Sequence, residues 1–312
     1  MTNGRFFDTV APRFKKSKTH SSEDEMRRDL SFVTLVCPDN DAESRLILLL
    51  AYRLGMTVIR SGQGLGATLE RERGDLLPLI DAAGGTEVWI VEIPGVDVEK
   101  RLSSLGFEVV IIDHHLYGTL DRSRDATGTL LPSSLEQFLT LTGITPYDLT
   151  NWGFDPVVVR GVAIMDARFV QGLREEGFTL PEIRRVLDFR RECARAGFPD
   201  FDKAEAAAKE AWSKREVVGR YIVVRSDADV PVRGAVCERS IYDNLDTHPI
   251  LIVDKGGVEI FVQNVDPEVT GRLMSAFADS HVFTFGGGRC WGINNTRGNT
   301  QYTLDDIIAV LT

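Results

Sequence analysis

The stretch Ile111-Ile112-Asp113-His114-His115 decides the fold class of this 312-residue chain. Its apolar residues end a run that predicts a buried strand, and three side chains able to ligate a metal follow at once. Buried strands of this kind occur in parallel sheets, and ligands bind at their carboxyl ends. The stretch therefore predicts a metal or ligand site at the edge of a parallel sheet. The alternative is a turn in which one histidine caps the next segment and the other is solvated.

Strands and helices alternate on both sides of that stretch. Before it, apolar runs predict strands over 32–37, 56–60, 87–93 and 108–112, with helices over 42–54, 68–83 and 98–105. This alternation is typical of an α/β fold with a doubly wound, mainly parallel sheet. After it, helical patterns cover 133–141, 156–166, 181–194 and 203–218. A second, smaller α/β unit follows, with strands over 221–225, 249–253, 258–263 and 281–285 and a helix over 304–311.

These patterns divide the chain into four predicted parts. They are a polar N-terminal arm (1–30), a metal-binding domain (31–195), a helical linker (196–218) and a C-terminal substrate-binding domain (219–312). Because the predicted metal residues and a glycine-rich loop lie on opposite sides of the linker, we expect the two domains to close on each other.

The composition narrows the range of functions. A formal net charge of -10 opposes non-specific binding to duplex nucleic acid, which needs a basic surface, but it is compatible with a small phosphorylated substrate. The chain lacks an apolar run long enough to cross a membrane and a hydrophobic signal segment, so we expect a cytoplasmic protein that does not bind membranes. The four cysteines are widely spaced, which predicts reduced, buried thiols: Cys37, Cys193, Cys237 and Cys290.

Carboxylates follow other predicted strands as well. Asp39 and Asp41 come directly after the first strand, where two acids spaced by one residue can hold one cation or two neighbouring cations. Asp41 is also a strong candidate for a helix cap. Glu92 lies within an apolar run, where an unpaired charge is costly. Asp166 ends another apolar segment, although an ion pair with Arg168 is a competing explanation.

Taken in order, these motifs resemble the DHH phosphoesterase family, which includes manganese-dependent hydrolases of oligonucleotides, cyclic dinucleotides and pyrophosphate. Residues 38–44 resemble its first motif, Asp113-His114-His115 its defining motif and residues 165–169 its fourth. The resemblance implies Asp113, His114 and His115 as catalytic residues. It also implies one or two Mn²⁺ ions, or Mg²⁺ instead, and a homodimer. The implied metal ligands are Asp39, Asp41, Glu92, Asp113, His114 and Asp166.

Three positions depart from the family pattern. Leu35 stands where the family has a metal-ligating histidine, and Glu92 stands where it has an aspartate. In the C-terminal domain, Arg289 replaces the histidine that follows a glycine-rich loop. We expect Gly286, Gly287, Gly288 and Arg289 to bind the substrate, since glycine amides approach phosphates closely and arginine binds them through its planar fork. The alternative for the three glycines is a tight turn.

The resemblance and the residues together predict a metal-dependent hydrolase. Its substrate would be a phosphodiester or phosphoanhydride in a small nucleotide-type molecule: a short oligonucleotide, a cyclic dinucleotide or pyrophosphate. The alternative is a protein that binds a nucleotide or phosphorylated ligand without turnover, because Leu35 removes a metal ligand. Gly62-Gln63-Gly64-Leu65-Gly66 does not have the spacing of a dinucleotide fingerprint and is interpreted as a loop near the cleft.

Overall fold

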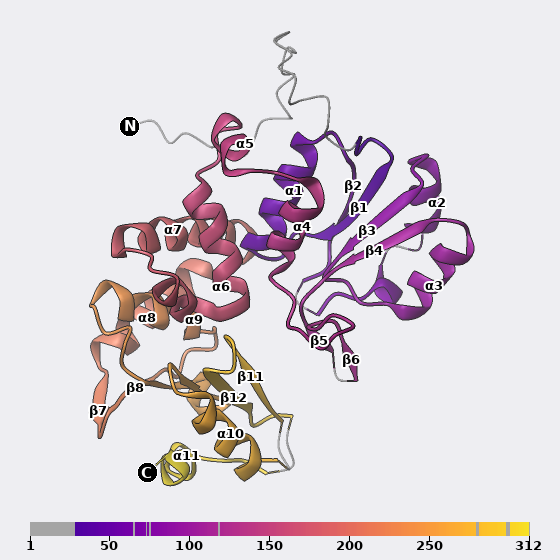
Figure 1. Cartoon of the computed structure of the whole chain (residues 1–312). Helices are drawn as coiled ribbons and strands as arrows, with labels where there is room; N and C mark the ends of the chain where they lie inside the picture. The colour runs from indigo at the N-terminus through magenta and orange to yellow at the C-terminus, as the bar shows by residue number, and fades with distance from the viewer. Residues whose placement is uncertain are drawn as a thin grey trace.

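The structure, a computed structural model, describes residues 29–64, 66–72, 74, 76–117, 119–278, 281–297 and 300–311. All but the last two residues of the predicted N-terminal arm (1–30) lie outside this range. Figure 1 shows a first sheet in indigo and purple, a group of pink helices and a second sheet in orange and yellow. The fold class is the predicted one: an α/β unit with a parallel sheet, followed by a smaller α/β unit.

The first sheet has four parallel strands in the order β2-β1-β3-β4. All four were predicted, within one or two residues, from their runs of valine, isoleucine and leucine: β1 (Val33–Pro38), β2 (Thr57–Ser61), β3 (Glu87–Val91) and β4 (Glu108–Ile112). Every residue of β1 is buried, as expected for a central strand covered on both faces. Because the strands are parallel, their carboxyl ends meet at one edge.

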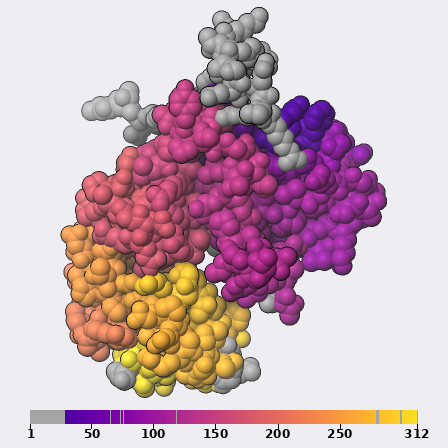
Figure 2. Space-filling view, viewed as in Figure 1, coloured from indigo at the N-terminus to yellow at the C-terminus, as the bar shows by residue number. Residues whose placement is uncertain are grey.

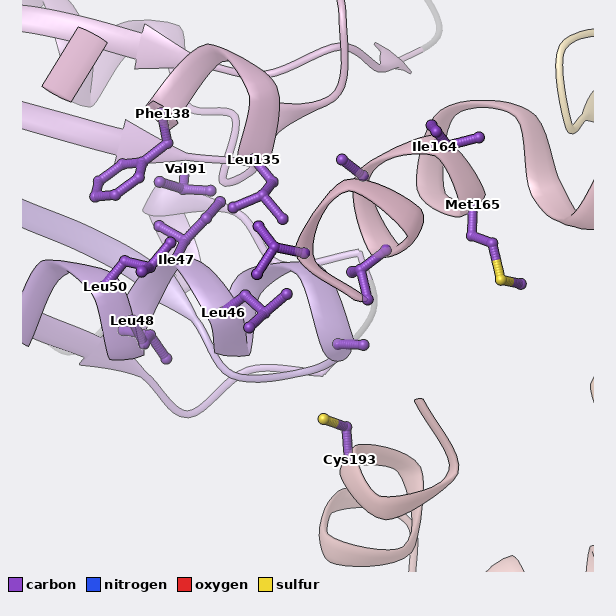
Figure 3. Close-up of a cluster of buried hydrophobic side chains, with 14 of the residues drawn as sticks. Leu46, Ile47, Leu48, Leu50, Val91, Leu135, Phe138, Ile164, Met165 and Cys193 are labelled. Atoms are coloured by element: carbon purple, nitrogen blue, oxygen red, sulfur yellow. The ribbon is translucent and has the colours of Figure 1, made fainter. Parts of the chain in front are cut away.

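Helices cover both faces of this sheet. Alternate residues of β1 point to opposite sides: Leu35 and Cys37 face one core, and Val36 faces the other. The first core packs against α1 (Ala42–Arg53), α4 (Ser134–Thr142), α5 (Pro146–Asn151), α6 (Pro156–Glu175) and α7 (Leu180–Gly197). The second core packs against α2 (Leu76–Ala82) and α3 (Val96–Ser104). Figure 3 shows the first core, with α1 side chains such as Leu46 and Ile47 facing Leu135 of α4.

One predicted helix is shorter than expected. The structure replaces the helix over 68–83 by a 3₁₀ turn, η2 (Leu69–Arg71), and the short helix α2. Gly74 lies between the two, and glycine is among the least favourable residues within a helix.

Helix α6 extends well beyond its predicted end at residue 166. Phe169 has left-handed backbone angles (φ 58°, ψ −163°), so the helix is kinked there and continues to Glu175. The Phe169 side chain contacts hydrophobic residues of both the first core and the C-terminal unit. The kink therefore lies where the two units meet.

The helical linker differs from its prediction. Helix α8 (Phe201–Ser213) ends five residues before the predicted end at residue 218, and residues 216–218 form strand β7 (Glu216–Val218). The β-branched pair Val217-Val218 favours a strand, and Gly219 adopts positive φ in the turn to β8 (Tyr221–Arg225). The predicted domain boundary at residue 195 falls inside α7.

The second sheet has six strands in the order β11-β12-β10-β9-β8-β7. Only the pair β8 and β9 is parallel. The other pairs are antiparallel, which the sequence patterns did not reveal. Its further elements are α9 (Arg233–Tyr242), β9 (Ile250–Asp254), η3 (Lys255–Gly257), β10 (Glu259–Gln263), α10 (Pro267–Ala276), β11 (Val282–Phe285), β12 (Cys290–Asn294) and α11 (Leu304–Leu311).

The C-terminal unit lies directly against the helices that precede it. Figure 2 shows its orange and yellow atoms in contact with the pink atoms of the helical region. Arg174 of α6 forms an ion pair with Asp246 at 2.6 Å, and Arg289 forms one with Glu175 at 3.0 Å. All four cysteines are free and buried, as predicted. Within the described ranges, none of the helices is long and apolar enough to cross a membrane.

Candidate metal centre

The carboxyl edge of the first sheet gathers acids and imidazoles. Glu92 follows β3, while His114 and His115 follow β4. Asp166 reaches the same place from α6. Each of these four residues offers one ligand atom, and the four atoms lie within 4.8 Å of one another. We call Glu92, His114, His115 and Asp166 the cation cluster.

His114 is the centre of the cluster. Its Nε2 atom lies 2.7 Å from Asp166 Oδ2, 3.4 Å from Glu92 Oε1 and 3.8 Å from Glu43 Oε2. Burial by itself lowers the pKa of His114, but contacts with Asp166 and Glu92 and the charges of both raise that pKa to about 10. The surrounding acids therefore favour the protonated imidazole when no cation is bound.

Glu43 lies beside the cluster and was not singled out from the sequence. Its side chain is 1% exposed, and its Oε1 atom accepts a hydrogen bond from the backbone N–H of Leu135 at 2.8 Å. Burial and the charges of Asp166 and Glu92 raise the pKa of Glu43 well above its usual range. A signal was present in the sequence: Glu43 lies three, four and seven residues before Leu46, Ile47 and Leu50, on the buried face of α1.

Asp41 combines a capping role with proximity to the cluster. Its Oδ1 atom accepts from the Ser44 backbone N–H at 2.8 Å, and its own N–H donates to Ser44 Oγ, forming a capping box at the start of α1. Burial, followed by the charges of Glu92 and Asp166, raises the pKa of Asp41 to about 6. The predicted helix cap is therefore present, and Asp41 is close enough to the other acids to interact with them electrostatically.

Asp113 organises the turn that presents the two histidines. Its Oδ1 atom accepts from the backbone N–H groups of His114 and His115 at 2.8 and 3.0 Å, and from the Tyr117 hydroxyl at 3.2 Å. The same oxygen lies 3.0 Å from His115 Nδ1. Asp113 lies outside the cation cluster as defined, and its Oδ1 atom holds the turn that carries His114 and His115; its predicted role as a metal ligand stays a prediction.

Two residues at this edge hold unusual backbone angles. Glu92 has φ 50°, and Phe169 has φ 58°, three residues after Asp166. Left-handed backbone is unfavourable for residues with a side chain and persists where the surrounding structure enforces it, often at functional sites. For Glu92 the backbone N–H donates to Ile112 O at 3.1 Å, which holds the residue in this conformation.

Asp39 is placed differently from the other predicted ligands. Its carboxylate forms ion pairs with Arg60 of β2 and with Arg45 of α1, the latter at 3.2 Å between Arg45 Nε and Asp39 Oδ1. The structure does not bring Asp39 into the cation cluster. Leu35, the position at which the DHH phosphoesterases that the motifs resemble have a histidine, is fully buried in the first core.

The glycine-rich segment is the turn of the hairpin β11–β12. Gly286, Gly287 and Gly288 have φ of 60°, 65° and 79°. A Cβ on Gly286 would lie 3.2 Å from Phe169 Cβ, and one on Gly287 would lie 3.6 Å from Arg168 Cγ. The three glycines form a tight turn that packs against the kink of α6, and binding of substrate by this turn stays a prediction.

The ion pairs of the two arginines near this turn are also defined. Arg168 forms an ion pair with Glu176 at 2.7 Å and not with Asp166. The alternative considered for Asp166, an ion pair with Arg168, is therefore wrong. Arg289 pairs with Glu175 at 3.0 Å across the two units. Its side chain is 38% exposed and remains reachable by a ligand.

The residues present fit a divalent cation. Three buried atoms of this region lack a directed hydrogen bond among the described residues: Glu43 Oε2, Glu92 Oε1 and His114 Nε2. Buried polar atoms are normally satisfied, and several acids this close repel one another. Imidazole nitrogen and carboxylate oxygen are the ligands that Mn²⁺ and related ions use. A cation held in the cluster would be a partner for Glu92 and His114, the two of these residues that belong to it.

Comparisons with known proteins identify no family. No family model and no curated protein matches the chain. Among solved structures, an exonuclease RecJ bound to manganese is 16% identical, with 89% of this chain and 88% of that chain covered and a TM-score of 0.39. RecJ from Thermus thermophilus with Mg²⁺ is 13% identical, covering 84% and 46% of the two chains, with a TM-score of 0.36. The pGpG-specific phosphodiesterase PggH from Vibrio cholerae is 10% identical, covering 89% and 96%, with a TM-score of 0.34.

Proposed function

We propose that this chain is a metal-dependent phosphoesterase that hydrolyses a phosphodiester or phosphoanhydride bond in a small nucleotide-type substrate. The observation that carries the proposal is the cation cluster, where buried ligand atoms of Glu92 and His114 meet Asp166 at the carboxyl edge of a parallel sheet. Ligands of α/β folds bind at this edge. The order of motifs that resembles the DHH phosphoesterases agrees with this placement.

Glu92, His114 and Asp166 of the cation cluster would hold the ion, and Asp41, whose pKa is raised by burial and by the charges of Glu92 and Asp166, is a predicted further ligand. Mn²⁺ is the expected ion, with Mg²⁺ as the alternative, because most of these ligands are oxygen and none is a thiolate. A bound ion of this kind supplies Lewis-acid stabilisation of the charge that develops on a phosphoryl group.

His115 is the residue placed to meet the substrate. Its side chain is 43% exposed, whereas that of His114 is 10% exposed. Burial lowers the pKa of His115, but the bond to Asp113 and the charge of Glu92 outweigh this and raise it. If Nδ1–H donates to Asp113, Nε2 is left to accept or donate a proton at a phosphate oxygen. Asp113 is then a positioning residue for His115.

A binding protein without turnover is the second candidate. The observation that favours it is the state of Asp39, which is paired with Arg45 and Arg60, together with the burial of Leu35. A site with fewer metal ligands would lose activation of the attacking water before it loses affinity for the ligand. The two candidates differ in turnover and not in the fold.

The experiment that separates them is a hydrolysis panel with Mn²⁺. Pyrophosphate, short linear oligonucleotides and cyclic dinucleotides are each incubated with the wild type, His114→Ala, Asp166→Ala and a matched control, His281→Ala, which alters an exposed histidine far along the chain. We expect phosphate or mononucleotide release by the wild type and by the control, and none by the other two variants. If the wild type binds Mn²⁺ and nucleotide but releases product from none of the substrates, the hydrolase proposal is wrong and the chain is a binding protein.

A further inference from the structure

One face of the second sheet is only partly covered by helices. Successive side chains of β10 and β11 point to opposite faces, and Val262 and Val282 pack on one face in the core formed with α10 and α11. Helices α8 and α9 cover the other face around β8 and β9. At the edge strand β11 this second face carries Phe283, which is 37% exposed although it is large and apolar. The edge of the sheet therefore presents an accessible aromatic side chain.

Three phenylalanine rings lie together on this face. The ring centroid of Phe283 is 6.0 Å from that of Phe285 and 6.3 Å from that of Phe261. Gly292 of β12 makes room for the rings, because a Cβ there would lie 2.8 Å from Phe283 Cζ and 2.9 Å from Phe261 Cδ1. We call Phe261, Phe283 and Phe285 the aromatic face. Aromatic side chains on a sheet are a surface on which nucleobases stack.

Arg233, the first residue of α9, lies over the aromatic face. Its guanidinium carbon is 4.5 Å from the ring centroid of Phe285 and 5.0 Å from that of Phe261. The residue is half-buried, and its side chain has no hydrogen bond or ion pair with any residue that the structure describes. A cation that is partly removed from water is normally paired with an acid. The N–H groups of Arg233 are therefore available to an anion, and their planar arrangement matches the oxygens of a phosphate.

The aromatic face adjoins the helix that carries Asp166. The ring centroid of Phe285 is 6.2 Å from that of Phe169, at the kink of α6 three residues after Asp166. The turn that follows Phe285 approaches the same kink, since a Cβ on Gly286 would lie 3.2 Å from Phe169 Cβ. A molecule bound on the aromatic face would thus lie on the side of the C-terminal unit that meets α6.

We propose that the aromatic face and Arg233 bind one nucleotide: its base stacks on Phe283, and Arg233 donates to its phosphate. The inference rests on the proposed function for the statement that this nucleotide belongs to the substrate. It narrows the substrate to a molecule that carries a nucleobase, which excludes inorganic pyrophosphate. Charge and shape both support this occupant, because the arginine lacks an acid and the exposed ring lacks a cover among the described residues.

The test is the binding of AMP to the full chain by isothermal titration calorimetry, with and without Mn²⁺. Ribose 5-phosphate is the probe that lacks the base, and adenosine is the probe that lacks the phosphate. The variants are Phe283→Leu, which removes the ring, Phe283→Tyr, which keeps it, and Arg233→Met, which keeps the aliphatic stem. The matched controls are Phe32→Leu, at a phenylalanine that is 55% exposed before β1, and Arg101→Met, at an exposed arginine of α3. Thermal unfolding of each variant shows whether its fold is retained.

We expect AMP affinity to fall by about tenfold in Phe283→Leu and in Arg233→Met, since base stacking is lost in the first and charge-assisted hydrogen bonds in the second. Phe283→Tyr and both controls should bind AMP as the wild type does. Ribose 5-phosphate should respond to Arg233→Met alone, and adenosine to Phe283→Leu.

Unchanged AMP affinity in a folded Phe283→Leu or Arg233→Met protein would overturn the proposal. So would a wild type that binds ribose 5-phosphate as tightly as AMP, or one that binds no AMP under either condition. AMP binding that depends on both residues, without hydrolysis of any substrate, would leave this inference standing and contradict the hydrolase. Hydrolysis of pyrophosphate without AMP binding would do the reverse.

Discussion

Two groups of acids at the same sheet edge are satisfied in opposite ways. Asp39, after β1, is neutralised inside the protein by Arg45 and Arg60. Glu92, after β3, shares one imidazole with Asp166 and Glu43, and ligand atoms there remain without a directed hydrogen bond among the described residues. A buried acid that already has an arginine does not need a cation, whereas a group of acids around one histidine does.

Leu35 lies on β1, the strand that precedes Asp39. Leu35 is fully buried in the first core, so it can only contribute packing. The nearby acid, Asp39, is paired with two guanidinium groups, and the group that could hold a cation is the one formed by Glu92, His114, His115 and Asp166.

The largest effect is expected from removing the central imidazole. His114→Ala should weaken Mn²⁺ binding by more than about a hundredfold, since loss of an outer partner alone typically costs 10–100-fold. Equilibrium dialysis against Mn²⁺ measures this, with His281→Ala as the matched variant. An affinity equal to that of the wild type would show that the cluster is not the metal site.

Glu238 of α9 is intermediate between Asp39 and the acids around His114. Like Asp39 it has two arginine partners, but they lie farther away than those of Asp39. Arg190 lies 3.9 Å away and Arg191 3.6 Å away, with Glu205 and Asp188 also acting on it. Burial outweighs the arginines and raises the pKa of Glu238 from 4.5 to about 7. The folded protein binds the proton on the Glu238 carboxyl more tightly than the unfolded chain does. The protonated carboxyl therefore contributes to the unfolding free energy below pH 4.5, and this contribution is lost as the pH rises to about 7.

The predicted loss is roughly 3 kcal/mol of unfolding free energy between these pH values. Urea unfolding of the wild type and Glu238→Gln across this range isolates the contribution, because all other titrating groups are shared. The stability difference between the two proteins should change by that amount in favour of the variant at the higher pH. A difference that does not vary with pH would contradict it.

A smaller effect is expected from Glu43, one of the acids that surround His114. Glu43→Gln keeps an oxygen for the Leu135 N–H but removes an acid from the crowded group. We expect the metal-free variant to be more stable than the wild type by about 1 kcal/mol, and to bind Mn²⁺ about tenfold more weakly. Melting temperatures with and without Mn²⁺ measure both effects. A variant that is destabilised without metal and keeps wild-type Mn²⁺ affinity would show that Glu43 is purely structural.

The smallest effect on stability is expected at Arg289. Its ion pair with Glu175 is partly exposed, so Arg289→Ala should change the unfolding free energy by less than about 1 kcal/mol. If the glycine-rich turn binds substrate as predicted, KM should nevertheless rise about tenfold while kcat changes little. An unchanged KM would remove Arg289 from the binding site.

Local patterns in the chain were sufficient to predict the first sheet. The runs of branched apolar residues in β1, β3 and β4 predicted buried parallel strands, and His114 was expected at their carboxyl edge for that reason. Glu92 was predicted within the strand over 87–93, but β3 ends at Val91 and Glu92 follows it. The cap at Asp41 also followed from local chemistry, because a short acid before a helical pattern favours that position.

What the sequence did not reveal depends on contacts between distant residues. The pairing of Asp39 with Arg60 arises because β2 lies next to β1, and a strand alignment is not visible in composition or spacing. The hairpin β11–β12 was not predicted, because the strand β12 was not recognised. Its Cys290-Trp291-Gly292 start lacks the alternation that marks a strand.

The most direct test is the Mn²⁺ stoichiometry of three proteins measured by calorimetry: the wild type, Asp39→Asn and Asp166→Asn. The two substitutions are chemically identical and both lie at the carboxyl edge of the first sheet. The account predicts one ion per chain in the wild type and in Asp39→Asn, and no measurable binding in Asp166→Asn. Loss of binding in Asp39→Asn, or wild-type binding in Asp166→Asn, would contradict it.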